Sequence, residues 1–112
     1  MFKEIKVGEQ TIGFLSNGAT PLYYKQTFGN DLLKSLNSSG EFELASDKMP
    51  ELAFIMAMQA EKADMKMLNM DKYIEFLERF DALDLQMASS AIIDVYLGNS
   101  LPTEKPKKKV KG

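Results

Sequence analysis

The sequence predicts a mainly α-helical α+β domain, a small four-helix domain with a short N-terminal β-hairpin. Apolar residues alternate near the N-terminus, recur at helical spacing from residue 20 to 97, and give way to a lysine-rich end without apolar periodicity. A chain of 112 residues has room for one hydrophobic core. We therefore expect a single domain over residues 1–100 and a flexible, disordered basic tail over residues 101–112.

The N-terminal residues have the pattern of two short antiparallel strands. Ile5 and Val7 alternate with charged residues within 3–7, and a second alternating stretch covers 10–15. Gly8 opens the connection between them, where a tight hairpin turn accepts glycine at its first position. An isolated hairpin is marginal in water, so we expect it to pack on the helices. Its edges are also candidate surfaces for strand addition between copies, which would make a homo-oligomer.

The next element is predicted to be an amphipathic helix over residues 20–37. Thr20 has the residue type of an N-cap, and Pro21 suits the first helical position. Gly29 costs on the order of 1 kcal/mol relative to alanine in a helix, and it predicts either a close helix contact or a kink. The expected apolar face contains Leu22, Tyr24, Phe28, Leu32, Leu33 and Leu36. A connector with a brief extended segment at 41–44 follows.

The methionine-rich stretch 49–70 organises the prediction, because as a helix near 50–69 it would be apolar on two sides. Five of the chain's eight methionines lie between residues 56 and 70. The opposite side from the main stripe carries Phe54, Met58 and Met65, close to half a turn away. The main stripe, at steps of three and four residues, consists of Met49, Ala53, Met56, Ala60, Ala63, Met67 and Met70.

A helix with two apolar faces needs two neighbours, and two interpretations follow. In the first, the helix is enclosed on both faces by the core of its own domain. In the second, Phe54, Met58, Met65 and Leu68 form a partner-binding surface, because methionine-rich surfaces re-pack around different partners. The residue pattern alone leaves both interpretations open.

Two further helices are predicted near 71–80 and 83–97. Asp71, Asp81 and Asp84 are all suitable N-caps. Gly98 fits the end of the last helix. The apolar faces contain Tyr73, Ile74, Phe76, Leu77 and Phe80 in the first, and Leu83, Leu85, Ala88, Ile92, Val95 and Tyr96 in the second.

The composition argues against catalysis and against a cofactor or metal site. The chain has no cysteine and no histidine, which removes thiol nucleophiles, the usual base at neutral pH, and thiolate or imidazole metal ligands. The sixteen acidic residues are dispersed, with no calcium-loop or phosphate-loop motif. We therefore expect a protein that is not an enzyme. No run of eighteen apolar residues predicts a membrane span.

The net charge of −2 is unevenly distributed. Residues 104–112 contain five lysines and one glutamate, a charge of +4, which leaves −6 on the remaining body. An acidic body is a poor surface for phosphate backbones, so we do not expect nucleic acid as a partner.

The stretch 18–36, GATPLYYKQTFGNDLLKSL, resembles the N-terminal signature of tail assembly chaperones from long-tailed (siphovirus-type) phages of Gram-positive bacteria. The matching elements are the Ala-Thr-Pro opening, the Tyr-x-x-x-Phe-Gly core and the Asp-Leu-Leu close. The segments 52–57, 73–77 and 92–96 follow in the same order as in that family. The resemblance covers roughly residues 3–98.

The resemblance implies a non-catalytic assembly factor. Such chaperones bind the tape measure protein in the host cell cytoplasm, keep it soluble, help recruit tail tube subunits and are absent from the mature virion. Their genes often end in a slippery site that yields a longer, frameshifted product, and the lysine run at 107–109 is compatible with A-rich codons. The resemblance supplies no catalytic residues. Two other classes stay open, a structural tail or tail-completion subunit and a small regulatory binding protein that uses the lysine tail on nucleic acid.

Overall fold

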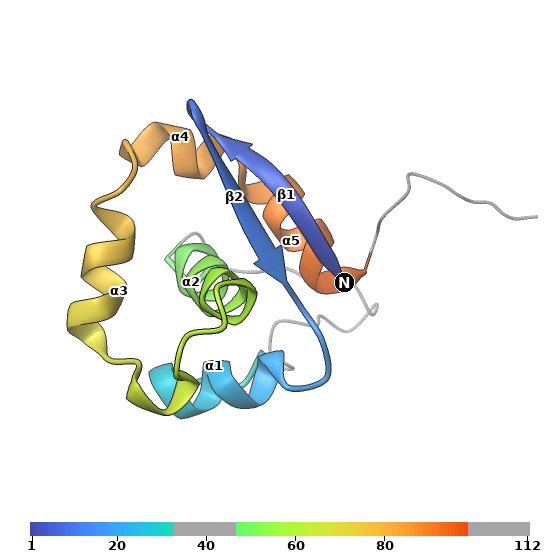
Figure 1. Ribbon diagram of the computed structural model, residues 1–112, viewed down its shortest axis with the longest axis vertical. Coiled ribbons are helices and arrows are strands. Elements are labelled where there is room, and N and C mark those ends of the chain that lie inside the picture. The colour runs from blue at the N-terminus through green and yellow to red at the C-terminus, as the bar shows by residue number, and fades with distance from the viewer. Residues whose placement is uncertain (33–46, 99–112) are drawn as a thin grey trace, which may run out of the picture.

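The computed structural model describes residues 1–32 and 47–98 of the chain (Figure 1). Within them an N-terminal hairpin is followed by four α-helices of eight or more residues, one shorter α-helix and a short 3-10 helix, which confirms the predicted α+β class. Three expectations lie outside the described residues: the predicted helical turns beyond residue 32, the extended segment at 41–44, and the tail at 101–112.

Helix α2 (Met49–Ala60) is the centre of the domain. Figure 1 shows it nearly end-on, with the hairpin and four other helices arranged around it. These helices are α1 (Thr20–Phe28), α3 (Met70–Leu77), α4 (Ala82–Met87) and α5 (Ser89–Leu97). Strand β2 (Gln10–Leu15) and helices α1, α3 and α5 all contact it. Every residue from Leu52 to Gln59 is buried. The two apolar faces of this segment are therefore explained by enclosure within the domain's own core.

The hairpin forms as the alternating pattern predicts. Strand β1 (Phe2–Val7) pairs antiparallel with β2, and Val7 lies opposite Gln10 across a two-residue turn. Gly8 has a φ of 63°, the left-handed conformation that the first position of such a turn favours for glycine. Ile5, Val7 and Phe14 are buried against the helices, so the hairpin has one apolar face in the core.

Helix α1 (Thr20–Phe28) is shorter than predicted because Gly29 ends it. Gly29 is left-handed, with a φ of 78°, and its N–H donates to the Lys25 carbonyl, so it is a C-cap rather than a kink. Thr20 is the first helical residue and not the N-cap. Its buried hydroxyl accepts from the Asn17 N–H at 2.9 Å and donates to Gln59 Oε1 at 2.7 Å, which ties the start of α1 to α2.

The predicted single helix across 50–69 is wrong, because α2 ends at Ala60. Lys62 adopts a left-handed φ of 59°. Its N–H donates to the Gln59 carbonyl at 3.1 Å, and the Ala63 N–H donates to the Met58 carbonyl at 3.0 Å. These two bonds form a Schellman motif, in which the residue after the cap is left-handed and the chain reverses. A lysine occupies the position that glycine usually takes.

The chain then builds a short 3-10 helix η2 (Met65–Met67) and α3 (Met70–Leu77). The N-cap of α3 is Asn69, whose side chain accepts from the Lys72 N–H at 2.9 Å, rather than Asp71. The predicted last helix is divided at Ala88 into α4 (Ala82–Met87) and α5 (Ser89–Leu97). Gly98 ends α5 in a left-handed conformation, as expected.

The Schellman motif predicts that Lys62→Gly stabilises the protein. A non-glycine residue pays for the left-handed conformation, and relief of that strain exceeds the added backbone entropy of glycine in the unfolded chain. We expect the free energy of unfolding to rise by about 0.5–1 kcal/mol, measured by urea denaturation. Lys25→Gly, at an exposed position inside α1, is the matched control and should lower stability by about the same amount. Equal destabilisation by both changes would contradict the assignment.

Candidate functional site

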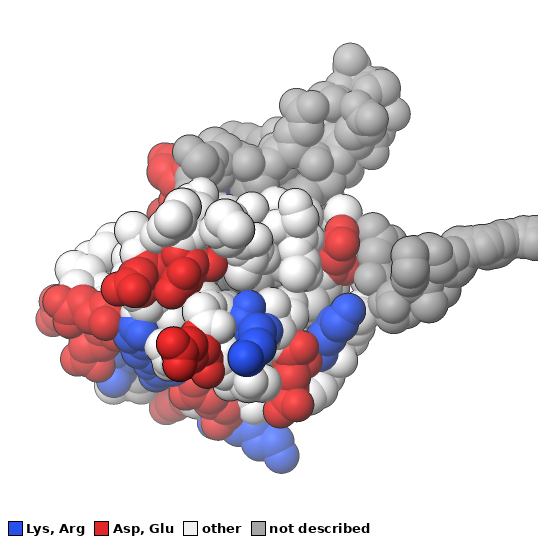
Figure 2. Space-filling view, turned by 90° about the horizontal axis from the view of Figure 1, so that it is seen from above, with Lys and Arg blue, Asp and Glu red and all other residues white. Residues whose placement is uncertain are grey.

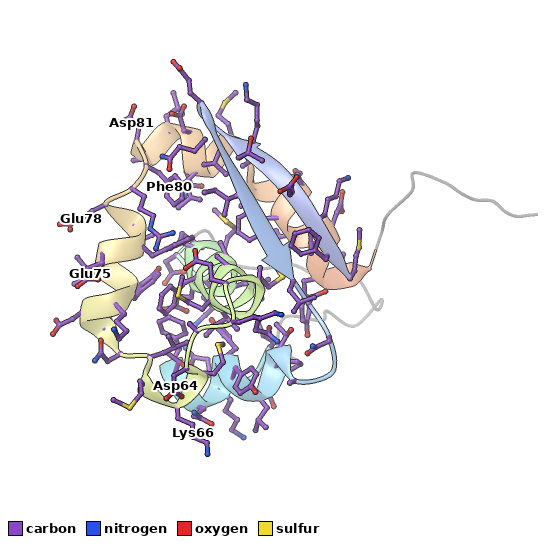
Figure 3. All side chains as sticks on the ribbon, in the orientation of Figure 1. Asp64, Lys66, Glu75, Glu78, Phe80 and Asp81 are labelled. Carbon is purple, nitrogen blue, oxygen red and sulfur yellow. The ribbon has the colours of Figure 1, made fainter. Side chains whose placement is uncertain are left out.

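A groove lies where the end of α2 meets the turn that follows it and the side of α3. Its cavity of about 240 Å³ is lined by Met58, Ala63, Asp64, Met67, Leu68, Lys72, Glu75 and Arg79. We call this surface the Met58 groove. Figure 3 shows Asp64 on the turn at one end of α3 and Glu75 on α3 itself.

The groove has an apolar floor and a charged rim. Met58 is only 7% exposed and forms part of the floor, whereas Met67 is 62% exposed at its mouth. On the rim, Arg79 Nη1 lies 3.0 Å from Glu61 Oε2, and its guanidinium stacks over the Phe76 ring at 5.6 Å. Both charged groups are substantially exposed, so the ion pair contributes about 0–1 kcal/mol and mainly orients Arg79.

The turn between α2 and α3, residues 61–69, forms one wall of the groove and is fixed by hydrogen bonds. Asp64 Oδ1 accepts from the Lys66 N–H at 3.1 Å, which caps η2. The Met65 carbonyl accepts from Gln26 Nε2 of α1 at 3.5 Å. Together with the Schellman motif at Lys62, these bonds place the turn against α1 and α2, and the space between the turn and α3 remains as the groove.

The predicted partner-binding residues divide into two groups. Met58 and Leu68 line the groove, and Met65 is partly buried against the core on the turn beside it. Phe54 has no exposed surface. Its ring lies 5.4 Å from that of Tyr73 and 5.6 Å from that of Phe76. A partner-binding role requires accessible surface, which Phe54 lacks in this structure.

Two tyrosines in and beside this cluster have raised pKa values. Tyr73 belongs to the cluster, and the Phe28 ring lies between it and Tyr24, 5.0 Å from the Tyr73 ring and 5.4 Å from the Tyr24 ring. The Tyr24 hydroxyl donates to Glu51 Oε1 at 2.6 Å. Burial, and then this hydrogen bond and the negative charge of Glu51, raise the pKa of Tyr24 far above its ordinary value. Burial first, and then the charges of Glu51 and Asp47, raise the pKa of Tyr73 to about 12. Both hydroxyls are therefore neutral at pH 7 and serve the packing between α1, α2 and α3.

Two other hollows lie near α4. One, of about 220 Å³, is mostly apolar and is lined by Pro50, Leu77, Phe80, Asp81, Ala82, Leu85 and Gln86. The other, of about 320 Å³, is polar and is lined by Val7, Glu9, Gln10, Glu78, Arg79, Phe80, Asp81 and Asp84. Figure 2 shows this side of the molecule, where acidic side chains gather. Among the described residues, no group of three or more acidic side chains is arranged to hold a metal ion.

Sequence reasoning missed most of the groove. Ala63 and Met67 were assigned to the opposite face from Met58, because a continuous helix would separate them by half a turn. The chain reversal at Lys62 brings them beside Met58 instead. The opposite wall carries Lys72 and Glu75 of α3 and Arg79, which follows just beyond the end of that helix. Their spacing of three and four residues is the signal in the sequence that places them on one side.

No family model, curated protein or solved structure matches the chain in comparisons with known proteins. None of the described helices is long and apolar enough to cross a membrane.

The burial of Met58 predicts that its packing in the core, rather than its place in the groove floor, determines the effect of a substitution on stability. With 7% exposure, Met58→Gln buries an amide with few partners and should lower the free energy of unfolding by about 2–4 kcal/mol. Met67→Gln, at the exposed mouth of the groove, should change it by less than about 0.5 kcal/mol. Thermal melts of the two variants measure the difference. A Met58→Gln protein as stable as wild type would show that the side chain contributes surface rather than core.

Proposed function

We propose that this protein is a tail assembly chaperone of a long-tailed phage, which binds the tape measure protein and keeps it soluble before tail tube subunits polymerise around it. Two observations support the proposal. The resemblance to that family runs through roughly residues 3–98. The Met58 groove offers an apolar floor that a helical client can contact.

The size of the groove suits a side-chain anchor rather than a small molecule. Its 240 Å³ is below the range of about 300–1,000 Å³ typical of small-molecule sites. An apolar residue protruding from a client helix would enter it, with the helix lying across the mouth. The rim carries both signs of charge, with Asp64 and Glu75 against Lys72 and Arg79, so it can pair with polar flanks of either sign.

The exposed Met67 at the mouth of the groove favours binding of many different client segments over selective binding of one. Met67 is unbranched and polarizable, and such side chains adapt to differently shaped partners. A tape measure protein presents many successive helical segments, and one small groove per copy would bind each of them weakly. Weak, repeated binding suits a helper that arriving tail tube subunits must displace.

In this proposal the protein acts in the host cell cytoplasm, without catalysis or cofactor, and is absent from the mature virion. A frameshifted longer form made from the same gene is a further expected partner. A structural tail-completion subunit is the alternative class, and it differs in one respect that is simple to observe, its presence in purified particles.

Co-expression with the tape measure protein of the same tail operon tests the proposal. The client alone should aggregate, and with this protein it should elute as a soluble complex with several copies of the chaperone. Met67→Gln should reduce the co-eluting client at least several-fold, because it replaces the exposed apolar side chain at the mouth of the groove with an amide.

Met70→Gln is the matched control for that change. Met70 is 57% exposed, close to the 62% of Met67, but it does not line the groove, so its variant should keep wild-type binding. Unchanged client solubility with the wild-type protein, or stoichiometric recovery of the protein from mature virions, would overturn the chaperone proposal. Equal loss of binding in both variants would place the client outside the groove.

A further inference from the structure

The outer edge of β1 has unused backbone hydrogen-bonding groups. Met1 and Ser16 form a hydrogen-bonded pair, because the Met1 amino group donates to the Ser16 carbonyl and the Ser16 N–H donates to the Met1 carbonyl. Such pairs alternate along an antiparallel ladder, and the register makes Lys3, Ile5 and Val7 the next ones on β1. The N–H and carbonyl groups of the residues between them therefore point away from β2, and these residues are Phe2, Glu4 and Lys6.

No described residue hydrogen-bonds to these outward groups, and the side chains beside them are exposed. Phe2, for example, is 57% exposed. Figure 1 shows β1 between β2 and α5 in this view, and β1 contacts both α5 and α4. Strand β2 contacts α2 and α5. The choice of β1 over β2 therefore rests on the charges that β1 carries.

The charged side chains on the β1 edge of one copy are complementary to those on the β1 edge of a second copy. Glu4 and Lys6 lie on one face of β1, opposite Gly13 and Thr11 on β2, so neither has a charged residue across the hairpin. If a second β1 runs antiparallel with Ile5 opposite Ile5 of the other copy, each Glu4 faces Lys6 of the other copy. The pair is related by a two-fold axis, and both charge pairs form at once.

We propose that β1 is the site at which a second copy of this chain adds, joining two hairpins into a four-stranded antiparallel sheet. The register centred on Ile5 uses the outward backbone groups of both Glu4 and Lys6. The neighbouring register, centred on Glu4, would set two carboxylates directly against each other, which is destabilising. Lysines on an edge strand usually hinder strand addition. Here the opposing Glu4 removes that hindrance for a second copy in one register.

The proposal goes beyond the chaperone function and does not depend on it. It is tested by sedimentation velocity over a range of protein concentrations, using charge reversals on the edge. Wild-type protein should show concentration-dependent dimers. Glu4→Lys sets lysine against lysine, and Lys6→Glu sets glutamate against glutamate, so each variant alone should self-associate at least about tenfold more weakly.

Mixing the two variants provides the decisive arm. A Glu4→Lys strand and a Lys6→Glu strand have opposite charges at both positions in the same register, so the mixture should form heterodimers at the wild-type affinity or tighter. The double variant, Glu4→Lys with Lys6→Glu, should recover self-association, and it also shows that the substituted strand still folds. Thr11→Lys, on β2, is the control and should dimerise as wild type does.

A wild-type protein that stays monomeric at millimolar concentration would overturn the proposal. So would single variants that associate as strongly as wild type, or a mixture that forms no heterodimer. Client binding is measured separately, so failure of this experiment leaves the chaperone test unaffected.

Discussion

The burial of α2 is the constraint on which the rest of the structure depends. This helix is apolar on all sides between Leu52 and Met58, and a helix of that kind is stable only when it is surrounded. Full burial of each large side chain contributes about 1.5–3 kcal/mol, so exposure of even one face would cost a large part of a small domain's stability. The hairpin, α1, α3 and α5 can each be understood as covering one side of it. The buried hydrogen bond between Thr20 and Gln59 and the partly buried one between Tyr24 and Glu51 then fix α1 on the helix.

The Met58 groove follows from the same arrangement. Met58 belongs both to the core and to the groove. Its carbonyl accepts the Ala63 N–H of the Schellman motif, and its side chain forms part of the groove floor. Each of the two interpretations of the methionine-rich stretch therefore applies to a different part of it. The part before Ala60 belongs to the core, and the part after it forms one wall of a surface groove.

The sequence predicted the elements whose signals are local. Alternation around Ile5 and Val7 with Gly8 at the turn was sufficient for the hairpin, and the apolar periodicity was sufficient for a helix that begins near residue 50. Whether both apolar faces of that helix are enclosed by the core was left open by the pattern. The end of α2 was missed because the left-handed residue is Lys62, and lysine carries no preference for that conformation. The role of Thr20 was missed for another reason: its partner Gln59 is thirty-nine residues away, and no periodicity reports such a contact. The groove depends on the chain reversal at Lys62, so it was missed with it.

Native-state hydrogen exchange of α2 tests the central claim most directly. If the helix is enclosed by the other elements, its amides between Ala53 and Met58 exchange only when the whole domain unfolds, and their opening free energy equals the global free energy of unfolding. Amides in α4 and in the turn after Lys62 should open at lower free energies. Exchange of the α2 amides through a local opening well below the global value would contradict the account.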